Sequence, residues 1–245
     1  MIEKEKYRGD YFSYLDSNEN HSRYYPAACQ INRWSKNRKI EVIDLGCGNG
    51  SLAKFFGENI LYTGVDHNRY AINYAKKKYK QYKNKTFSCL DNINIATDKT
   101  GHKYDVVILS GLLFHNINIK SLEKYNDCDF LYSCISNILK KEGFLIIIAP
   151  FAYGEWKEHD FWVQSRWKYN EVIKVINQLI KKVNIEIIFE NLSKQIGIEN
   201  IIRQQKNTPE WFVKNFREKP KNKYSGEKLA TWTFILKSIL IKYDS

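Results

Sequence analysis

Three features of this 245-residue sequence predict an α/β fold, with a mostly parallel sheet covered by helices on both faces. Apolar, β-branched runs of strand length alternate with amphipathic stretches of helix length, as in consecutive βαβ units. Continuous runs such as Ile146-Ile147-Ile148 are typical of parallel strands buried on both sides. One apolar run leads directly into three glycines at alternate positions, in VIDLGCGNG (42–50), which indicates a sharp turn at a strand end.

The first half of the chain supplies four of the expected strands. Its apolar positions follow a helical spacing before the first strand and in the lysine-rich stretch AKKKYKQYKNK (75–85), whose lysines are typical of a solvated helix face. The elements expected in order are a helix within 21–34, a strand at 39–46, a short helix at 51–59, a strand at 60–66, a helix at 69–83, and strands at 85–91 and 104–110.

The second half supplies three more strands, which makes seven in all. The expected elements are a helix at 121–141, a strand at 143–150, a helix at 170–182, and strands at 183–192 and 231–241. A hydrophobic content of 43% and an aromatic content of 15% are enough to build a sizeable core, so disorder is not expected over most of the length.

The chain divides into a short N-terminal segment and one main domain. Residues 1–38, which are polar and aromatic, are expected to form a helical lid on the domain of residues 39–245. Within that domain, residues 151–167 hold three tryptophans and are expected to cap the carboxyl ends of the strands, although those tryptophans could equally form the core of the cap. Residues 194–229 are expected to form an insertion before the last strand.

Composition limits the classes of partner. The net charge of +12 fits a partner that carries phosphates, but also codon-driven enrichment in lysine, and an anionic small molecule fits either reading. Five scattered cysteines without a CxxC pair indicate neither a zinc site nor a disulfide framework. The first residues lack an apolar leader, and the longest apolar run (144–152) is too short to span a bilayer, so a cytoplasmic protein without membrane insertion is expected.

The glycine-rich stretch at 42–50 is expected to be a ligand loop. Open α/β sheets bind ligands outside the carboxyl ends of their strands, and glycine lets a ligand approach the backbone closely there. The dinucleotide fingerprint G-x-G-x-x-G does not fit G-C-G-N-G, and the G-K-[ST] of a phosphate-binding P-loop is absent. The acid of this stretch, Asp44, precedes the glycines.

The stretch Ile43-Asp44-Leu45-Gly46-Cys47-Gly48-Asn49-Gly50 resembles motif I of class I S-adenosylmethionine (SAM)-dependent methyltransferases, hh-[DE]-x-G-x-G-x-G. YDVVILSGLLFHNI (104–117) resembles the fourth-strand motif of that family, and LKKEGFLIIIAP (139–150) resembles its fifth strand, with Glu142-Gly143 in place of two glycines. The resemblance covers about residues 39–150. It implies a Rossmann-like fold, SAM as cofactor and S-adenosylhomocysteine as product.

The resemblance also implies which residues bind the cofactor. The set is Asp44, Gly46, Cys47 and Gly48 at the first strand end, Asp66 and His67 at the second, Asp91 and Asn92 at the third, and Ser110 at the fourth. Asp44 and the loop would hold the methionine part, Asp66 the ribose hydroxyls and Asp91 the adenine. Each acid also has an alternative role that involves no ligand. Asp44 could cap the next helix, Asp66 could cap the helix near Asn68, and Asp91 could simply end a strand.

The end of the fourth strand narrows the methyl acceptor. Its Ser110-Gly111-Leu112-Leu113 lacks the prolines of the family's amino-methylating DNA enzymes and the Pro-Cys of its cytosine-C5 enzymes. The paired glutamates of protein arginine methyltransferases are absent as well. Enzymes that act on small molecules remain, and a hydroxyl acceptor needs a proton acceptor at transfer. His115, in the loop after the fourth strand, and His159, in the cap segment, are the candidate bases.

The sequence therefore favours a methyltransferase that acts on a hydroxyl of a small metabolite, such as a sugar or nucleotide-linked sugar of polysaccharide or capsule biosynthesis. The net charge and the aromatic insertion keep an RNA or tRNA base methyltransferase open as an alternative. A non-catalytic SAM-binding subunit is a third reading, because neither histidine is marked as a base by its surroundings. The methylated atom and the oligomeric state stay open.

Overall fold

The computed structural model describes residues 16, 24–91, 94–95, 101–110, 127–152, 185–194 and 229–238. The expected helix at 170–182, most of the cap at 151–167 and most of the insertion at 194–229 lie outside these residues. So do Asn92, His115 and His159.

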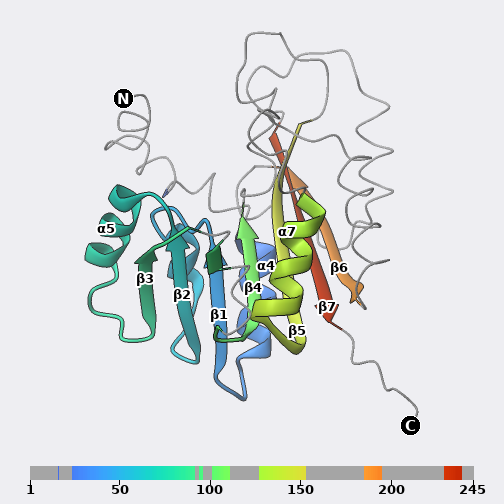
Figure 1. The fold of residues 1–245 in the computed structure, drawn as a ribbon, viewed down its shortest axis with the longest axis horizontal. Helices are drawn as coiled ribbons and strands as arrows, with labels where there is room; N and C mark the ends of the chain where they lie inside the picture. Colours follow the sequence, from blue (N-terminus) through green and yellow to red (C-terminus); the bar gives the residue numbers. More distant parts are fainter. Residues whose placement is uncertain are drawn as a thin grey trace.

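The described strands form one sheet in the order β3-β2-β1-β4-β5-β7-β6 (Figure 1). Their bounds are β1 (Ile40–Leu45), β2 (Ile60–Asp66), β3 (Lys85–Cys89), β4 (Tyr104–Ser110), β5 (Leu139–Ala152), β6 (Ile185–Lys194) and β7 (Leu229–Ser238). The pairs among β1 to β5 are parallel, whereas β7 is antiparallel to both β5 and β6. This confirms the predicted mostly parallel, Rossmann-like sheet.

The strand order reverses at β1, which lies between β2 and β4. Strands β2 and β3 extend the sheet to one side of β1, while β4 and β5 extend it to the other (Figure 1). Connections that leave β1 and β4 in opposite directions open a crevice above the carboxyl ends of these strands, and ligands of open α/β sheets bind at that point. The glycine-rich stretch follows β1 directly, so the topology places it in this crevice.

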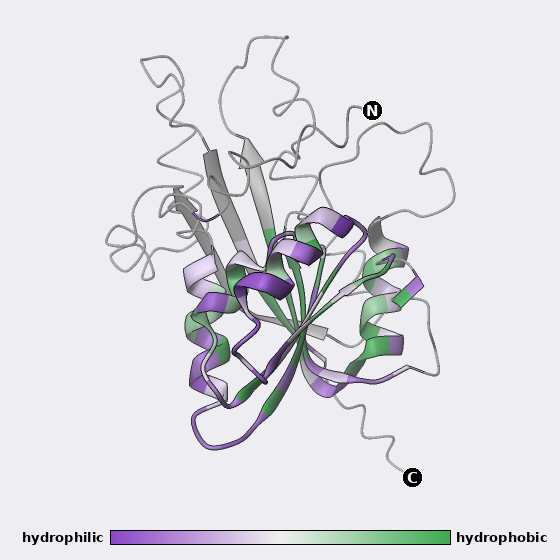
Figure 2. Cartoon of the chain, turned by 90° about the vertical axis from the view of Figure 1, so that its left-hand side faces the viewer, coloured by the Kyte–Doolittle hydropathy of each residue, from purple (hydrophilic) through white to green (hydrophobic). Residues whose placement is uncertain are grey.

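Helices cover both faces of the sheet, as predicted. On one face, α4 (Tyr25–Trp34), the short 3₁₀ helix η2 (Ser51–Phe55) and α5 (Arg69–Lys78) share one core cluster with the even-numbered side chains of β1 and β2. Helix α7 (Asp127–Ser133), extended by a π-helical turn over Cys134–Ile138, covers the other face in front of β4 and β5 (Figure 1). Figure 2 shows the strands between these layers, with hydrophobic residues toward the middle.

Part of the predicted lid belongs to the core. In α4, Ala27, Ala28 and Ile31 are buried, and the ring of Trp34 stacks on Phe144 of β5 with centroids 3.9 Å apart. Helix α4 is thus a layer on the sheet. Apart from Asp16, the segment before residue 24 lies outside the described residues, and the lid there stays a prediction.

Three helix predictions were too long, and one of them is the helix expected at 69–83, which ends at Lys78 as α5. The expected helix at 121–141 ends within the described residues at Ile138, and Leu139 already pairs with Tyr104 as the start of β5. The register then shifts before Phe144, and Glu142 takes a left-handed φ of 58°, so the LKKEG stretch forms a strand irregularity. The expected helix at 51–59 is only the five-residue η2, because Phe56 directly after it has an extended backbone.

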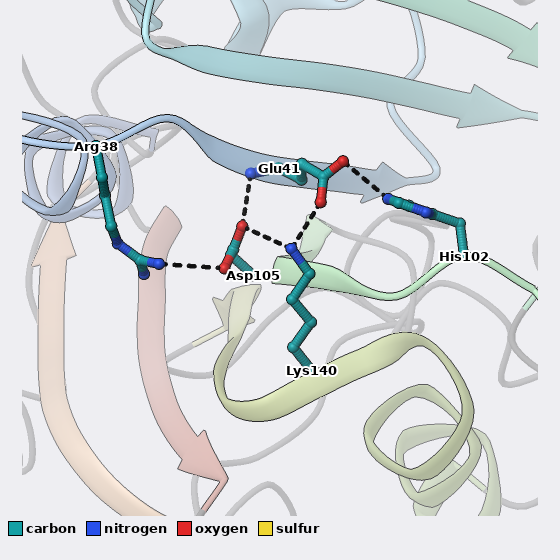
Figure 3. Close-up of polar contacts among 5 residues, drawn as sticks. All are labelled: Arg38, Glu41, His102, Asp105 and Lys140. Atoms are coloured by element: carbon teal, nitrogen blue, oxygen red, sulfur yellow. Dashed lines mark hydrogen bonds and ion pairs between the residues drawn. The ribbon is translucent and has the colours of Figure 1, made fainter.

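A polar network ties together the amino ends of β1, β4 and β5 (Figure 3). Lys140 Nζ lies 2.6 Å from Glu41 Oε2 and 3.2 Å from Asp105 Oδ2. His102 Nε2 lies 2.9 Å from Glu41 Oε1, and Arg38 Nη1 lies 3.5 Å from Asp105 Oδ1. Because the backbone N–H of Glu41 also donates to Asp105 at 2.9 Å, the network fixes the edge opposite to the glycine loop.

Candidate functional site

The loop after β1 requires glycine at three positions. Gly46, Gly48 and Gly50 have φ values of 76°, 55° and 73°, which lie in the left-handed region that other residues rarely adopt. The N–H groups of Gly46 and Cys47 both donate to the carbonyl of Val65, at 2.8 and 3.0 Å, so the loop is hydrogen-bonded to the end of β2. The sequence prediction of a tight, glycine-dependent turn is confirmed.

Two of these glycines have different surroundings. A Cβ atom on Gly50 would lie 2.6 Å from Cε1 of Phe87 and 3.2 Å from the ring of Tyr79, so this position is closed by packing. A Cβ atom on Gly48 would meet nothing within 4 Å. Gly48 is therefore the point at which a ligand can approach the loop backbone.

Asp44 is a buried acid at the end of β1, with 1% of its surface exposed. Its Oδ2 accepts a hydrogen bond of 2.7 Å from the hydroxyl of Tyr62 on β2. The N-cap of the following 3₁₀ helix is Gly50, and no side chain caps it. The alternative that Asp44 caps the next helix is therefore wrong.

Asp66 connects the loop with the start of α5. Its Oδ2 accepts the N–H of Gly48 at 2.9 Å, and its Oδ1 accepts the N–H of Asn68 at 2.8 Å. The N-cap of α5 is Asn68, whose side chain accepts from Tyr70 and Ala71, so the alternative that Asp66 is this cap is wrong. A carboxylate oxygen can accept a second hydrogen bond, so Asp66 keeps capacity for a pair of hydroxyls.

The remaining predicted residues lie at neighbouring strand tips. Asp91, which is exposed, follows β3, and Ser110 ends β4. The Ser110 hydroxyl is buried and has no hydrogen-bond partner among the described residues. The side chain of His67 is 66% exposed, with Nδ1 3.6 Å from Asp66 Oδ1. Because β1 to β4 are parallel neighbours, all these tips lie along one edge of the sheet (Figure 1).

Cys47 is a packing residue. Its Sγ occupies the space above Gly64, where a Cβ atom would lie only 2.8 Å away. Burial raises the pKa of the Cys47 thiol well above its ordinary value, and the charges of Asp44 and Asp66 raise it further. A thiol that stays protonated is a poor nucleophile, so Cys47 does not carry the chemistry.

Sequence reasoning missed the residues that support the loop from below and from the N-terminal segment. Tyr62 and Tyr79 donate to the loop region, and neither stands out in its strand or helix pattern. Asp16 accepts from Ser51 Oγ at 2.7 Å and from Lys78 Nζ at 2.6 Å, which fastens one point of the N-terminal segment beside the loop. Period-two alternation in ILYTGVD does place Tyr62 on the face of Gly64 and Asp66, which was the one available signal.

The sequence profile of a methyltransferase domain family matches residues 36–223, which is most of the chain. The chain belongs to this methyltransferase domain family. The class I SAM-dependent family expected from the motifs is thereby confirmed, and SAM is the methyl donor of the domain.

Two curated proteins resemble the methyltransferase domain over part of their length. One is a protein of Invertebrate iridescent virus 6 that carries a methyltransferase name, 28% identical over 165 residues, which are 66% of this chain and 51% of the relative. The other is a ubiquinone biosynthesis O-methyltransferase of Pelagibacter ubique, 29% identical over 113 residues, which are 45% of this chain and 42% of the relative. The chain thus spans about half the length of these relatives.

Solved methyltransferase structures share the fold at low sequence identity. The N-methyltransferase NodS of Bradyrhizobium japonicum, in complex with S-adenosylhomocysteine, has a TM-score of 0.60 at 12% identity and covers 97% of this chain and 96% of its own. The plantazolicin methyltransferase BpumL, also in complex with S-adenosylhomocysteine, has a TM-score of 0.57 at 16% identity. The match covers 93% of this chain and 89% of BpumL. These likenesses show that the domain shares its fold with solved methyltransferases.

The residues at the sheet edge fit the cofactor. Gly48 offers open space next to the loop backbone, and the buried carboxylate of Asp44 provides negative charge just before the loop. The carboxylate of Asp66, 8% exposed, retains hydrogen-bonding capacity for two ribose hydroxyls. Among the described residues, no cluster of His, Cys, Asp or Glu side chains could hold a metal ion. No helix in those same ranges is long and apolar enough to cross a membrane.

Proposed function

We propose that the methyltransferase domain transfers a methyl group to a hydroxyl of a small metabolite, such as a sugar or nucleotide-linked sugar. Cofactor binding is supported by the open position at Gly48, whose N–H donates to Asp66, and by the buried carboxylate of Asp44 just before the loop. A hydroxyl of a small metabolite as methyl acceptor is supported by two observations. One curated relative is named an O-methyltransferase, and the sequence after β4 lacks the motifs of nucleobase-methylating enzymes.

Each proposed residue has a defined task at the edge of the sheet. Asp66 accepts the ribose hydroxyls, Asp44 stabilises the cationic amino-acid portion, and Asp91 with Asn92 accepts from the adenine. Ser110 lies next to the methionine end. When bound, SAM supplies a methyl group on a sulfonium, which is already a strong electrophile. The protein therefore has to align the acceptor, exclude water and accept one proton.

His115 and His159 are the proposed proton acceptors. Each follows a strand whose carboxyl end lies at the sheet edge, β4 for His115 and β5 for His159. A neutral imidazole has a pKa suited to take the proton of a hydroxyl as it attacks the methyl group. If one of them is the base, its replacement by glutamine lowers kcat by about a hundredfold or more, while the other variant keeps its rate.

Release of S-adenosylhomocysteine tests this function. The domain is incubated with SAM and a panel of nucleotide-linked sugars and simple sugars, and His115→Gln and His159→Gln are run in parallel. Acceptor-dependent release with one of the two variants inactive supports the proposal. Release with none of these sugars but with other hydroxyl compounds contradicts the sugar assignment, and binding of SAM without release for any acceptor indicates a non-catalytic subunit.

One observation favours a second candidate function, methylation of an RNA base. Residues 69–84, which comprise α5 and the turns after it, contain six cationic and no acidic residues. Tyr70, Tyr74 and Tyr82 of this segment are 55%, 38% and 45% exposed. Lysines bind phosphates and exposed aromatic rings stack on unpaired bases, so this segment has the composition of a surface for single-stranded RNA.

Charge reversal tests the RNA alternative. Binding of a labelled single-stranded RNA oligonucleotide is measured over a series of salt concentrations for the native protein and for Lys77→Glu with Lys80→Glu. The matched control is Lys36→Glu with Lys39→Glu, because all four lysines are exposed and the charge change is equal. A loss of binding confined to the first variant supports the RNA alternative. Equal losses in both variants, or no binding at low salt, reject it.

A further inference from the structure

An aromatic layer lies directly beneath the glycine loop. It consists of Phe56, Tyr62, Tyr79 and Phe87, all of which are buried. The ring of Tyr62 lies between those of Phe56 and Phe87, with centroids 5.5 and 5.6 Å away, and Tyr79 stacks on Phe87 at 5.4 Å. Since Phe87 also closes the space at Gly50, the layer and the loop form one packed unit.

The two tyrosines in this layer each direct a hydroxyl to one end of the loop. Tyr62 donates to Asp44 Oδ2 at 2.7 Å, just before the first glycine, and Tyr79 donates to the carbonyl of Gly50 at 2.9 Å, at the third glycine. Burial raises the pKa of both phenols, and the charge of Asp44 further raises that of Tyr62. Both hydroxyls therefore stay protonated and remain donors.

Packing alone does not account for the hydroxyl of Tyr62. A phenylalanine would make the same ring contacts with Phe56 and Phe87, and its burial would be more favourable. The strand register places Tyr62 opposite Val42 and Gly64 opposite Asp44. Cys47 Sγ and the Phe87 ring occupy the space at Gly64. The Tyr62 hydroxyl reaches the Asp44 carboxylate on the same sheet face. A charge-assisted hydrogen bond at 2.7 Å fixes the orientation of that carboxylate.

We propose that Tyr62 is a positioning residue for cofactor binding, which holds the carboxylate of Asp44 in the orientation that faces the amino-acid portion of SAM. The inference rests on the proposed role of Asp44 as the acid for that portion. A side chain of the binding site that is already held by a hydrogen bond loses less conformational freedom when the ligand binds. The hydrogen bond therefore raises the affinity for the ligand. Tyr79 has no such role, because it bonds a backbone carbonyl.

A matched pair of variants and a matched pair of ligands test the proposal. Tyr62→Phe and Tyr79→Phe each remove one buried hydroxyl from the same layer and keep the ring. Binding is measured by calorimetric titration with S-adenosylhomocysteine, which has the amino-acid portion, and with 5′-methylthioadenosine, which lacks it. Melting temperatures monitor any general loss of stability.

Tyr62→Phe is expected to weaken S-adenosylhomocysteine binding about tenfold and methylthioadenosine binding less than about twofold. Tyr79→Phe is expected to change the affinities for both ligands by the same factor. The inference is overturned if Tyr62→Phe leaves the S-adenosylhomocysteine affinity unchanged or weakens both ligands equally. The variant Asp44→Asn distinguishes failure of the Tyr62 inference from failure of the proposed site. If Asp44→Asn leaves S-adenosylhomocysteine binding intact, the proposed role of Asp44 itself is wrong.

Discussion

At the residue scale, the glycines of the loop have different roles. All three have left-handed backbone conformations, but Gly50 is enclosed by Phe87 and Tyr79, whereas Gly48 borders open space. A methyl group added at either position strains the backbone, and only at Gly50 does it also collide with the aromatic layer. Stability and cofactor affinity should therefore depend on different glycines of the same motif.

Gly50→Ala is expected to lower the free energy of unfolding by about 2–4 kcal/mol, because backbone strain adds to overpacking. Gly48→Ala is expected to cost about 1 kcal/mol in stability, which is the backbone strain alone. Its larger effect is expected on S-adenosylhomocysteine affinity, about tenfold, because the new methyl group enters the space for the ligand. Chemical denaturation and ligand titration of both variants measure the two effects, and equal destabilisation by both variants would contradict this division.

The proposed cofactor site shows what single residues reveal in a sequence. Asp44, Gly48 and Asp66 could be located because a motif and a strand end mark each of them. Tyr62 could not, since its strand pattern explains its burial without its hydroxyl. Asp16 could not either, because its contacts with Ser51 and Lys78 join residues far apart in the chain.

At the element scale, the start of β5 depends on one glycine. A Cβ atom on Gly143 would lie 2.8 Å from the carbonyl oxygen of Lys140 and 3.0 Å from that of Asp105. These are backbone atoms of the strand irregularity and of β4, so neither can move without disturbing the sheet. The neighbouring Glu142 takes the left-handed conformation that a glycine would adopt without strain.

Gly143→Ala is therefore expected to lower the free energy of unfolding by about 2 kcal/mol. Gly57→Ala is the matched control, because its new Cβ atom would only meet Asn32 Oδ1 at 3.8 Å. The control is expected to be neutral within about 0.5 kcal/mol. Denaturant titration of the two variants checks this contrast. Unchanged stability of Gly143→Ala would mean that β4 and β5 can separate at this point without cost.

Elements with a clear period were predicted well, and the turn into β5 was not. YDVVILS (104–110) matches β4 residue for residue, because its apolar run is bounded on both sides. In LKKEG, leucine and lysines favour a helix, but pairing of Leu139 with Tyr104 and the contacts of Lys140 with Glu41 and Asp105 hold the stretch at the start of β5. Such tertiary pairing has no signature in local sequence.

At the scale of the whole molecule, the two edges of the sheet have different roles. The carboxyl edge holds the acids and the open loop, while the amino edge is closed by the network around Glu41 and Lys140 (Figure 3). The hydrogen bond from Lys140 lowers the pKa of Glu41. Burial opposes this effect, and a smaller contribution from the hydrogen bond of His102 adds to the lowering. Folding stability therefore depends on pH through a network that lies at the edge of the sheet opposite to the glycine loop.

Glu41 is expected to contribute stability that is present above its unfolded pKa and lost as pH falls through its lower folded pKa. Between about pH 5 and pH 3, the native protein should lose roughly 0.5–1 kcal/mol more than Glu41→Gln, a modest value because both partners are partly exposed. Urea denaturation over this pH range measures the difference. Parallel pH profiles for the two proteins would show that the network adds no stability.

Calorimetric titration of S-adenosylhomocysteine into the native protein and Asp66→Asn tests the central claim most directly. The account predicts binding at one site in the native protein and an affinity at least about tenfold lower in the variant, because the amide accepts fewer hydrogen bonds from hydroxyl groups. No heat of binding to the native protein at about millimolar ligand, or equal affinities for both proteins, would contradict the assignment of this edge as the cofactor site.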